Sequence, residues 1–368
     1  MTAPRSYDEL LRRAPDAARA LTGAEKSNWN DTVRPVNRRR VLGIADRDGT
    51  MYLDESKVAG PLREMFETPG AQHDDETLER YSTALKTLLH EHVHLQGTEG
   101  SRAADSYRNL SRRGTRELEE GATEAWSHAT VGRFAEELEL DEIAPGISDA
   151  RIDATYPEYT PAAQKLAAAV GAEAGLEQND VLRRMSAVSA DQKWELAADL
   201  MYDARGLGEV IPPGREAEVK SNIVRAMQNT MDLEHLKDYP DDTARTASAQ
   251  VGTNAYRAGA READMYAEMY QARGLSPERR QAAQQWRGDG RITPPSAGRP
   301  PGAGPGSLLD SAPAAGQLPG DARHAVHLLN NGSPPLSSAR PLNTAEFGAR
   351  GSEPHSQPLQ RQSPDRGR

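Results

Sequence analysis

The sequence predicts an α+β fold that is mainly α-helical and has a small β-sheet near its N-terminus. Apolar residues recur at helical spacing in four long segments, at residues 161–175, 191–206, 217–236 and 244–274. The one clear strand signal is an Asp-Gly step at 48–49 between two short apolar runs, a pattern typical of a β-hairpin. These two observations set the fold class.

The first part of the chain is expected to be an N-terminal helical segment, residues 1–35. Its first 23 residues have an amphipathic pattern and lack the uninterrupted apolar run of a signal peptide. The predicted hairpin follows, with strands within 38–45 and 50–54. The three arginines at 38–40 are interpreted as a solvated strand end rather than a nucleic-acid patch.

A folded domain is expected over residues 36–275, with the sheet and the helices that carry the candidate site at 36–140 and a helical subdomain at 141–275. From about residue 288 the chain is rich in proline, glycine and serine and holds about half of its 25 prolines. Such a segment buries too little apolar surface to offset the entropy of ordering. Residues 276–368 are therefore predicted to be a disordered tail.

Charge and composition narrow the functional classes. The formal net charge of −10 argues against nucleic acid as a partner, and no apolar run is long enough for an integral membrane segment. Without cysteine, only histidine and the carboxylates remain as strong metal ligands. A cytoplasmic location is the default expectation, with export by a route that needs no cleavable signal left open.

The stretch LLHEHVHLQG at 88–97 holds the candidate site. A strand would place His90, His92 and His94 on one face, whereas a helix would pair only His90 with His94. The residues before it favour the helix, because an acidic start at 74–76 suits an N-terminus and Gly97 suits a C-terminal stop. Apolar residues at helical spacing lie between these ends: Leu78, Tyr81, Leu85, Leu88 and Leu89.

On this helix the histidines separate by role. His92 falls in the apolar stripe and is interpreted as a packed core histidine with a satisfied ring nitrogen. His90 and His94 are one turn apart and can both face one ion, while Glu91 lies to the side of the pair.

Residues 90–94 fit HExxH and so resemble the zincin metallopeptidases. This resemblance implies one Zn²⁺ held by His90 and His94, with Glu91 as the catalytic residue that takes a proton from the attacking water. It also implies a zincin-like fold in which a small sheet lies beside the active-site helix.

The third zinc ligand depends on the subfamily. The metzincin extension HExxHxxGxxH matches at Gly97 but fails at Gly100. The block EGATE at 120–124 is similar to the EGxxE block of gluzincins, which implies Glu120 as a metal ligand. The same block implies Glu124 as the carboxylate that orients a ligating histidine.

A plainer interpretation of this second helix remains. Glutamates 117, 119, 120 and 124 could form a solvated, charged helix face. His128 shares a face with Glu120 and Glu124, and Tyr156 and Tyr159 follow the helix. Gluzincins use a tyrosine or histidine to hold the oxyanion, so Tyr159 and His128 are candidate oxyanion stabilisers, with Tyr156 beside them. His235 is interpreted as a surface histidine, and Trp126 and Trp194 as core residues.

The predicted function is zinc-dependent hydrolysis of peptide bonds in a peptide or protein substrate. Two alternatives stay open: a non-catalytic zinc-binding protein with a zincin fold, and a secreted effector or toxin protease whose tail serves delivery. Endopeptidase or exopeptidase action, substrate identity and oligomeric state do not follow from the sequence.

Overall fold

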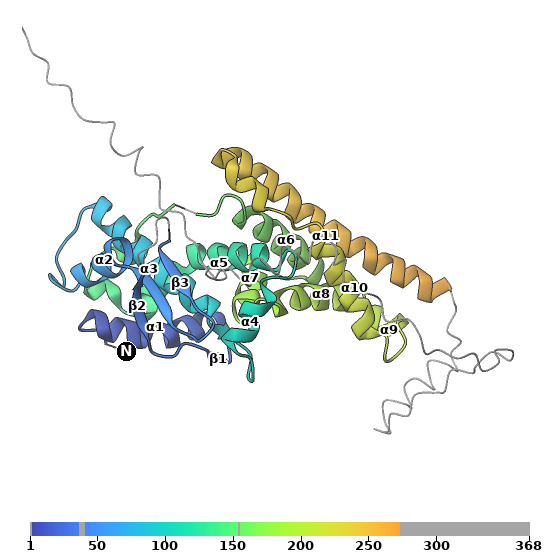
Figure 1. Cartoon of the computed structure of the whole chain (residues 1–368), viewed down its shortest axis with the longest axis horizontal. Helices are drawn as coiled ribbons and strands as arrows, with labels where there is room; N and C mark the ends of the chain where they lie inside the picture. Colours follow the sequence, from blue (N-terminus) through green and yellow to red (C-terminus); the bar gives the residue numbers. More distant parts are fainter. Residues whose placement is uncertain (1, 37–40, 154, 273–368) are drawn as a thin grey trace, which may run out of the picture.

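A computed structural model describes residues 2–36, 41–153 and 155–272. The described chain is mainly helical with a small amount of β-structure, which confirms the predicted class (Figure 1). Its α-helices are α1 (Tyr7–Thr22), α2 (Gly60–Glu64), α3 (Asp75–His94), α4 (Ala103–Asn109), α5 (Thr115–Glu137), α6 (Thr160–Ala174), α7 (Gln178–Ser186), α8 (Gln192–Ala204), α9 (Leu207–Val210), α10 (Glu216–Gln228) and α11 (Asp241–Ala272). Four short helical turns are η1 (Glu55–Ala59), η2 (Leu140–Glu142), η3 (Ile147–Asp149) and η4 (Glu234–Asp238).

The predicted hairpin is present as β3 (Gly43–Ala45) and β4 (Met51–Asp54), which pair antiparallel. Its turn contains Gly49 at φ 85°, a left-handed conformation that glycine adopts without strain. A third strand, β2 (Val33–Val36), pairs parallel to β4, so the order β2-β4-β3 leaves β3 at an edge. The segment expected to be helical over 1–35 therefore contains α1 and also residues of β2. Pro35 is tolerated in β2 because this strand lies at the other edge of the sheet, where a missing N–H donor breaks no pairing.

Helix α3 begins and runs as the sequence predicted. The Asp74 side chain accepts a hydrogen bond from the Thr77 backbone N–H at 2.9 Å and caps the first turn, where Asp75 and Glu76 favour the helix dipole. Residues 88–94 are helical, so the strand alternative for the three histidines was wrong.

The predicted stop at Gly97 was also wrong, because the helix ends at His94. Residues Gln96–Gly97 form strand β5, which pairs antiparallel with β1 (Lys26–Ser27). Gly97 instead allows the Ser101 side chain to lie close to the backbone, because a Cβ at position 97 would lie 2.2 Å from Ser101 Oγ. Pairing with β1 therefore pulls the chain out of the helix before the glycine is reached.

Helix α5 lies in the middle of the described chain, between the sheet with α1–α3 and the later helices (Figure 1). It packs against α3 on one side and against α6 and α7 on the other. Trp126 on α5 and Trp194 on α8 are buried in this core, as predicted. The core thus brings residues of α5 into contact with helices that lie both before and after it in the chain.

None of the described helices is both long and apolar enough to cross a lipid bilayer. The arginines at 38–40 and the predicted tail at 276–368 lie outside the described residues.

Candidate metal centre

His90 and His94 form a close pair in the last turns of α3. Their Nε2 atoms lie 3.0 Å apart, and their ring centroids lie 4.7 Å apart at 80°. The four-residue spacing puts both imidazoles on one face of the helix, as expected. Both residues are buried, with at most 3 % exposure.

Glu120 on α5 completes a three-residue group. Its Oε2 lies 3.7 Å from each of the two Nε2 atoms. A triangle with sides 3.0, 3.7 and 3.7 Å has a circumscribed radius of about 2.0 Å, which matches the usual zinc–nitrogen and zinc–oxygen bond lengths. Within the part of the chain that the structure describes, His90, His94 and Glu120 are the group whose donor atoms could hold a metal ion. Two imidazoles and one carboxylate suit zinc.

The outer nitrogens of both imidazoles face carboxylates from α5. His90 Nδ1 lies 3.2 Å from Glu124 Oε2, and His94 Nδ1 lies 2.7 Å from Glu119 Oε1. An ionised carboxylate can only accept, so Nδ1 donates in each pair and the Nε2 atoms face the metal position. Glu124 and Glu119 thus each accept from one imidazole of the pair.

Glu119 was missed by the sequence analysis, which treated it only as part of a charged face. That solvated-face interpretation was wrong for Glu119, Glu120 and Glu124, because all three are buried. The EGxxE resemblance names the residue before the glycine and the one three after it, so it gives no reason to single out position 119.

Two lysines that the sequence analysis also missed lie behind these carboxylates. Lys86 Nζ donates to Glu124 Oε1 at 2.6 Å, and Lys193 Nζ lies 3.2 Å from Glu119 Oε2. Lys86 precedes His90 by one helical turn, so its face could have been inferred from α3. Lys193 belongs to α8, and no local pattern connects it with the HExxH motif.

Glycines let two backbone segments approach the site closely. A Cβ at Gly121 would lie 2.6 Å from the carbonyl oxygen of Tyr159, so the glycine of the EGxxE block makes room for the chain that follows η3. A Cβ at Gly43 would lie 2.4 Å from Glu91 Oε1. The fully buried Glu91 carboxylate therefore lies against the backbone of the edge strand β3.

The carboxyl and imidazole groups shift one another's pKa. Burial raises the pKa of Glu120, but the imidazoles of His90 and His94, whose Nε2 atoms lie 3.7 Å from Oε2, outweigh burial and lower it to about 2. Burial lowers the pKa of His94, but the hydrogen bond with Glu119 and the nearby Glu120 carboxylate outweigh burial and raise this pKa to about 10. Burial also opposes ionisation of Glu119, whose pKa is nevertheless lowered by Lys193 and His94. The cluster thus favours ionised carboxylates.

His92 is buried as predicted and packs edge-on against Trp29, with ring centroids 5.3 Å apart. The expected hydrogen bond to one of its ring nitrogens is absent: neither nitrogen has a hydrogen-bond partner among the described residues. Burial lowers the pKa of His92 to about 3, so the ring is neutral.

The candidate oxyanion stabilisers Tyr159 and His128, and Tyr156 beside them in the sequence, occupy different places. Tyr156 stacks on His90, with centroids 5.9 Å apart and an interplanar angle of 13°, and has φ 54°. Tyr159 stacks on Tyr156 and donates its hydroxyl to Glu234 Oε1 at 2.7 Å.

His128 Nε2 forms a hydrogen bond with the carbonyl oxygen of Ile152 at 3.1 Å. His128 is eight residues after Glu120 on α5, so the two residues are about 12 Å apart along the helix axis. His235 is exposed, as predicted for a surface histidine.

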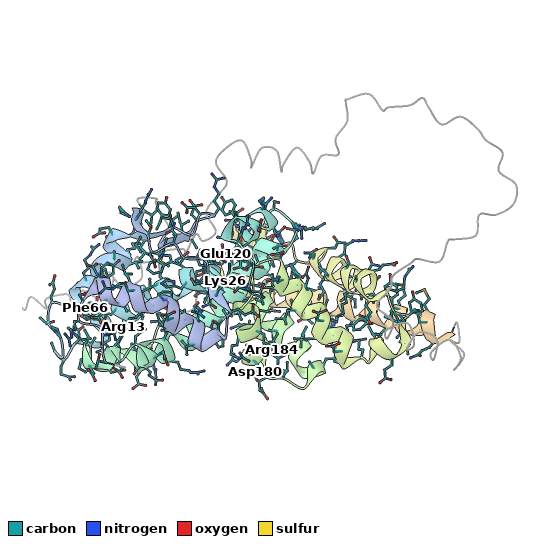
Figure 2. All side chains as sticks on the ribbon, turned by 90° about the horizontal axis from the view of Figure 1, so that it is seen from below. Arg13, Lys26, Phe66, Glu120, Asp180 and Arg184 are labelled. Carbon is teal, nitrogen blue, oxygen red and sulfur yellow. The ribbon has the colours of Figure 1, made fainter. Side chains whose placement is uncertain are left out.

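Figure 2 labels Glu120 in the interior of the described chain, where side chains of several helices converge. Comparisons of the chain with protein-family models, with curated proteins and with solved structures give no match. Any functional conclusion therefore depends on the geometry of the site itself.

Proposed function

We propose that this protein is a zinc-dependent metallopeptidase with a zincin-like, gluzincin-type site. The observation that carries the proposal is the triangle of His90, His94 and Glu120 donor atoms, with Glu91 next to the first ligand on the same helix. Zincins use these residue types in this motif. The resemblance implies Glu120 as the third ligand and Glu124 as the carboxylate that orients a ligating histidine, and Glu124 Oε2 lies 3.2 Å from His90 Nδ1.

The chain's own residues have distinct parts in the proposed reaction. Zinc, when bound, supplies a Lewis acid that lowers the pKa of water and polarises a peptide carbonyl. Glu91 accepts the proton from the attacking water and delivers it to the leaving amine. The Glu91 carboxylate lies against Gly43 of the edge strand β3, so a peptide beside that strand would have its scissile bond near this base.

The number of protein donors favours a catalytic metal over a structural one. Structural zinc sites usually have four protein ligands, whereas catalytic sites have three and keep a position for water or substrate. The group found among the described residues has three.

Burial favours the second candidate, a non-catalytic zinc protein. His90, Glu91, His94 and Glu120 are each at most 3 % exposed. Both candidates require the same zinc ligands. They differ in whether the zinc-loaded protein cleaves peptides, a reaction that would need Glu91.

Metal content tests the ligands. We expect one equivalent of zinc in the purified protein by elemental analysis and its loss in His90→Ala and in Glu120→Ala. His235→Ala and Glu136→Ala are matched controls because both residues are exposed, and Glu136 lies on the same helix as Glu120. Zinc retained in Glu120→Ala would mean that another residue is the third ligand.

Turnover tests the peptidase. The zinc-loaded protein is incubated with a mixture of peptides from a proteome digest, and new termini are identified by mass spectrometry. We expect cleavage by the wild type and none by Glu91→Gln, which should still bind zinc. Zinc binding without new termini in either protein would support the non-catalytic candidate.

A further inference from the structure

Two buried lysine–glutamate–histidine chains converge on the metal position. Each begins at an ammonium group, passes through a glutamate of α5 and ends at a ligating imidazole. Neither lysine lies within the HExxH or EGxxE blocks. Lysine is rarely buried unless it is paired, so each ammonium calls for an explanation.

The first chain is Lys86–Glu124–His90. Lys86 Nζ donates to Glu124 Oε1 at 2.6 Å and to Thr155 Oγ1 at 3.1 Å. Thr155 in turn donates to the same Glu124 oxygen through its backbone N–H at 3.0 Å and its hydroxyl at 2.5 Å. The other Glu124 oxygen is thereby left to His90 Nδ1, at 3.2 Å.

The second chain is Lys193–Glu119–His94. Lys193 Nζ donates to the carbonyl oxygens of Met185 at 2.6 Å and Val188 at 3.2 Å, which lie at and just after the end of α7. Lys193 Nζ also forms an ion pair with Glu119 Oε2, at 3.2 Å. Lys193 therefore connects the end of α7 and helix α8 to the carboxylate that accepts from His94.

These chains distinguish three carboxylates that the sequence presents alike. Glu119, Glu120 and Glu124 are all buried on α5 and all lie near the histidine pair. Lysine pairs hold Glu119 and Glu124 against the Nδ1 atoms. Neither Glu120 oxygen has a hydrogen-bond partner among the described residues, so this carboxylate is the one left facing both Nε2 atoms.

We propose that Lys86 and Lys193 are positioning residues of the metal centre: each fixes one glutamate on the outer nitrogen of one histidine and thereby reserves Glu120 for the metal. Lys193 makes the later helical region part of the site, because it comes from α8 rather than from the helices that carry the ligands. The inference rests on the metal centre of the proposed function, but it does not require peptidase activity.

Zinc affinity of single variants is the first test. Zinc dissociation constants are measured by competition with a chromophoric chelator for Lys86→Met and Lys193→Met, which keep the length of the side chain and remove its charge. We expect each to weaken zinc about tenfold, within the range seen when groups that orient metal ligands are changed. Lys220→Met is the control, since Lys220 pairs with Asp199 on the partly exposed surface of α10 and α8. It should bind zinc as the wild type does.

A spectroscopic readout separates positioning from general loss of structure. In the Co²⁺-loaded protein the visible absorption reports the arrangement of the ligands around the metal. We expect its bands to shift in both lysine variants and to stay unchanged in Lys220→Met, while the far-ultraviolet circular dichroism of all three stays that of the wild type.

Double variants test whether the two chains are separate. Within one chain, Lys193→Met with Glu119→Gln should bind zinc about as weakly as Glu119→Gln alone, because the lysine acts through that glutamate. Across chains, Lys86→Met with Glu119→Gln should weaken zinc by about the product of the two single effects. The within-chain double variant also removes both charges, so it remains informative if Lys193→Met alone does not fold.

The outcomes separate the two proposals. A wild-type protein that binds zinc, together with lysine variants of unchanged affinity and unchanged Co²⁺ spectrum, would overturn this inference and leave the metal centre standing. Within-chain effects that simply multiply would overturn it as well. A wild-type protein without zinc, even after reconstitution, would remove both.

Discussion

Replacing Gly43 with alanine tests where Glu91 lies. Gly43 has no left-handed φ, so alanine fits the backbone, but its Cβ would lie 2.4 Å from Glu91 Oε1, 2.6 Å from Cγ and 2.7 Å from Cδ. An ordinary contact is about 3.4 Å or more, so the fully buried Glu91 side chain must move by about 1 Å. Overpacking of this kind costs about 1–3 kcal/mol.

Part of that cost is offset because alanine has fewer unfolded conformations than glycine, by about 0.4–1 kcal/mol. We therefore expect the free energy of unfolding to fall by about 1–2 kcal/mol and the Tm by about 2–8 °C. Denaturant and thermal unfolding of the metal-free protein measure both. Gly208→Ala is the matched control, because the nearest atom to its added Cβ is 3.7 Å away.

A double-mutant cycle isolates the contact. Glu91→Ala removes Cγ, Cδ and Oε1, so adding Gly43→Ala to it should cost nothing or should stabilise the protein slightly. The unfolded-state gain cancels in this cycle, so the coupling free energy between the two positions should equal the overpacking cost of about 1–3 kcal/mol. An equal cost of Gly43→Ala with and without the Glu91 side chain would refute the placement of this carboxylate against β3.

Three further results are expected. Burial raises the pKa of Glu117 to about 7 from an ordinary value of 4.5, so the stability that its neutral form provides is present below pH 4.5 and is lost as the pH rises through 7. We therefore expect Glu117→Gln to gain unfolding free energy relative to the wild type, by on the order of 2 kcal/mol more at pH 8 than at pH 5. Denaturant unfolding of the metal-free proteins at both pH values measures this difference. Tyr159→Phe removes the hydroxyl donated to Glu234 and should cost about 0.5–1.5 kcal/mol while one equivalent of zinc remains, whereas loss of zinc would place this hydroxyl at the metal. His92→Phe keeps the ring that meets Trp29 and gives up no hydrogen bond among the described residues, so its unfolding free energy should stay within about 1 kcal/mol of the wild type, and a larger loss would indicate a polar partner of the imidazole.

Local geometry explains what could be predicted from the sequence. The pairing of His90 with His94 follows from the period of one helix, and the Asp74 cap and the apolar stripe identify that helix. The β3–β4 hairpin is equally local, because an Asp-Gly turn joins strands that are neighbours in the chain. The position of Glu120 required more, and came from the resemblance of its EGxxE block to that of gluzincins.

Contacts between distant segments explain what was missed. Strand β2 pairs parallel with β4 although β3 lies between them in the sequence. Strand β1 pairs with β5, and this pairing ends α3 before Gly97. Neither pairing has a signal in its own short sequence. Lys193 reaches Glu119 only because α8 packs beside α5, and a glutamate that will be buried beside a lysine has the same local pattern as one that will face water.

The contact between Lys193 and Glu119 also has a consequence for folding during synthesis. The helices that carry His90, His94 and Glu120 are synthesised before α8, so a growing chain has every ligand before it has the ammonium that neutralises Glu119. Closing the core at that stage would bury a carboxylate without its cation, which is costly. The N-terminal half should therefore stay open on the ribosome until α8 emerges, and metal uptake should be a late event in the life of the nascent chain.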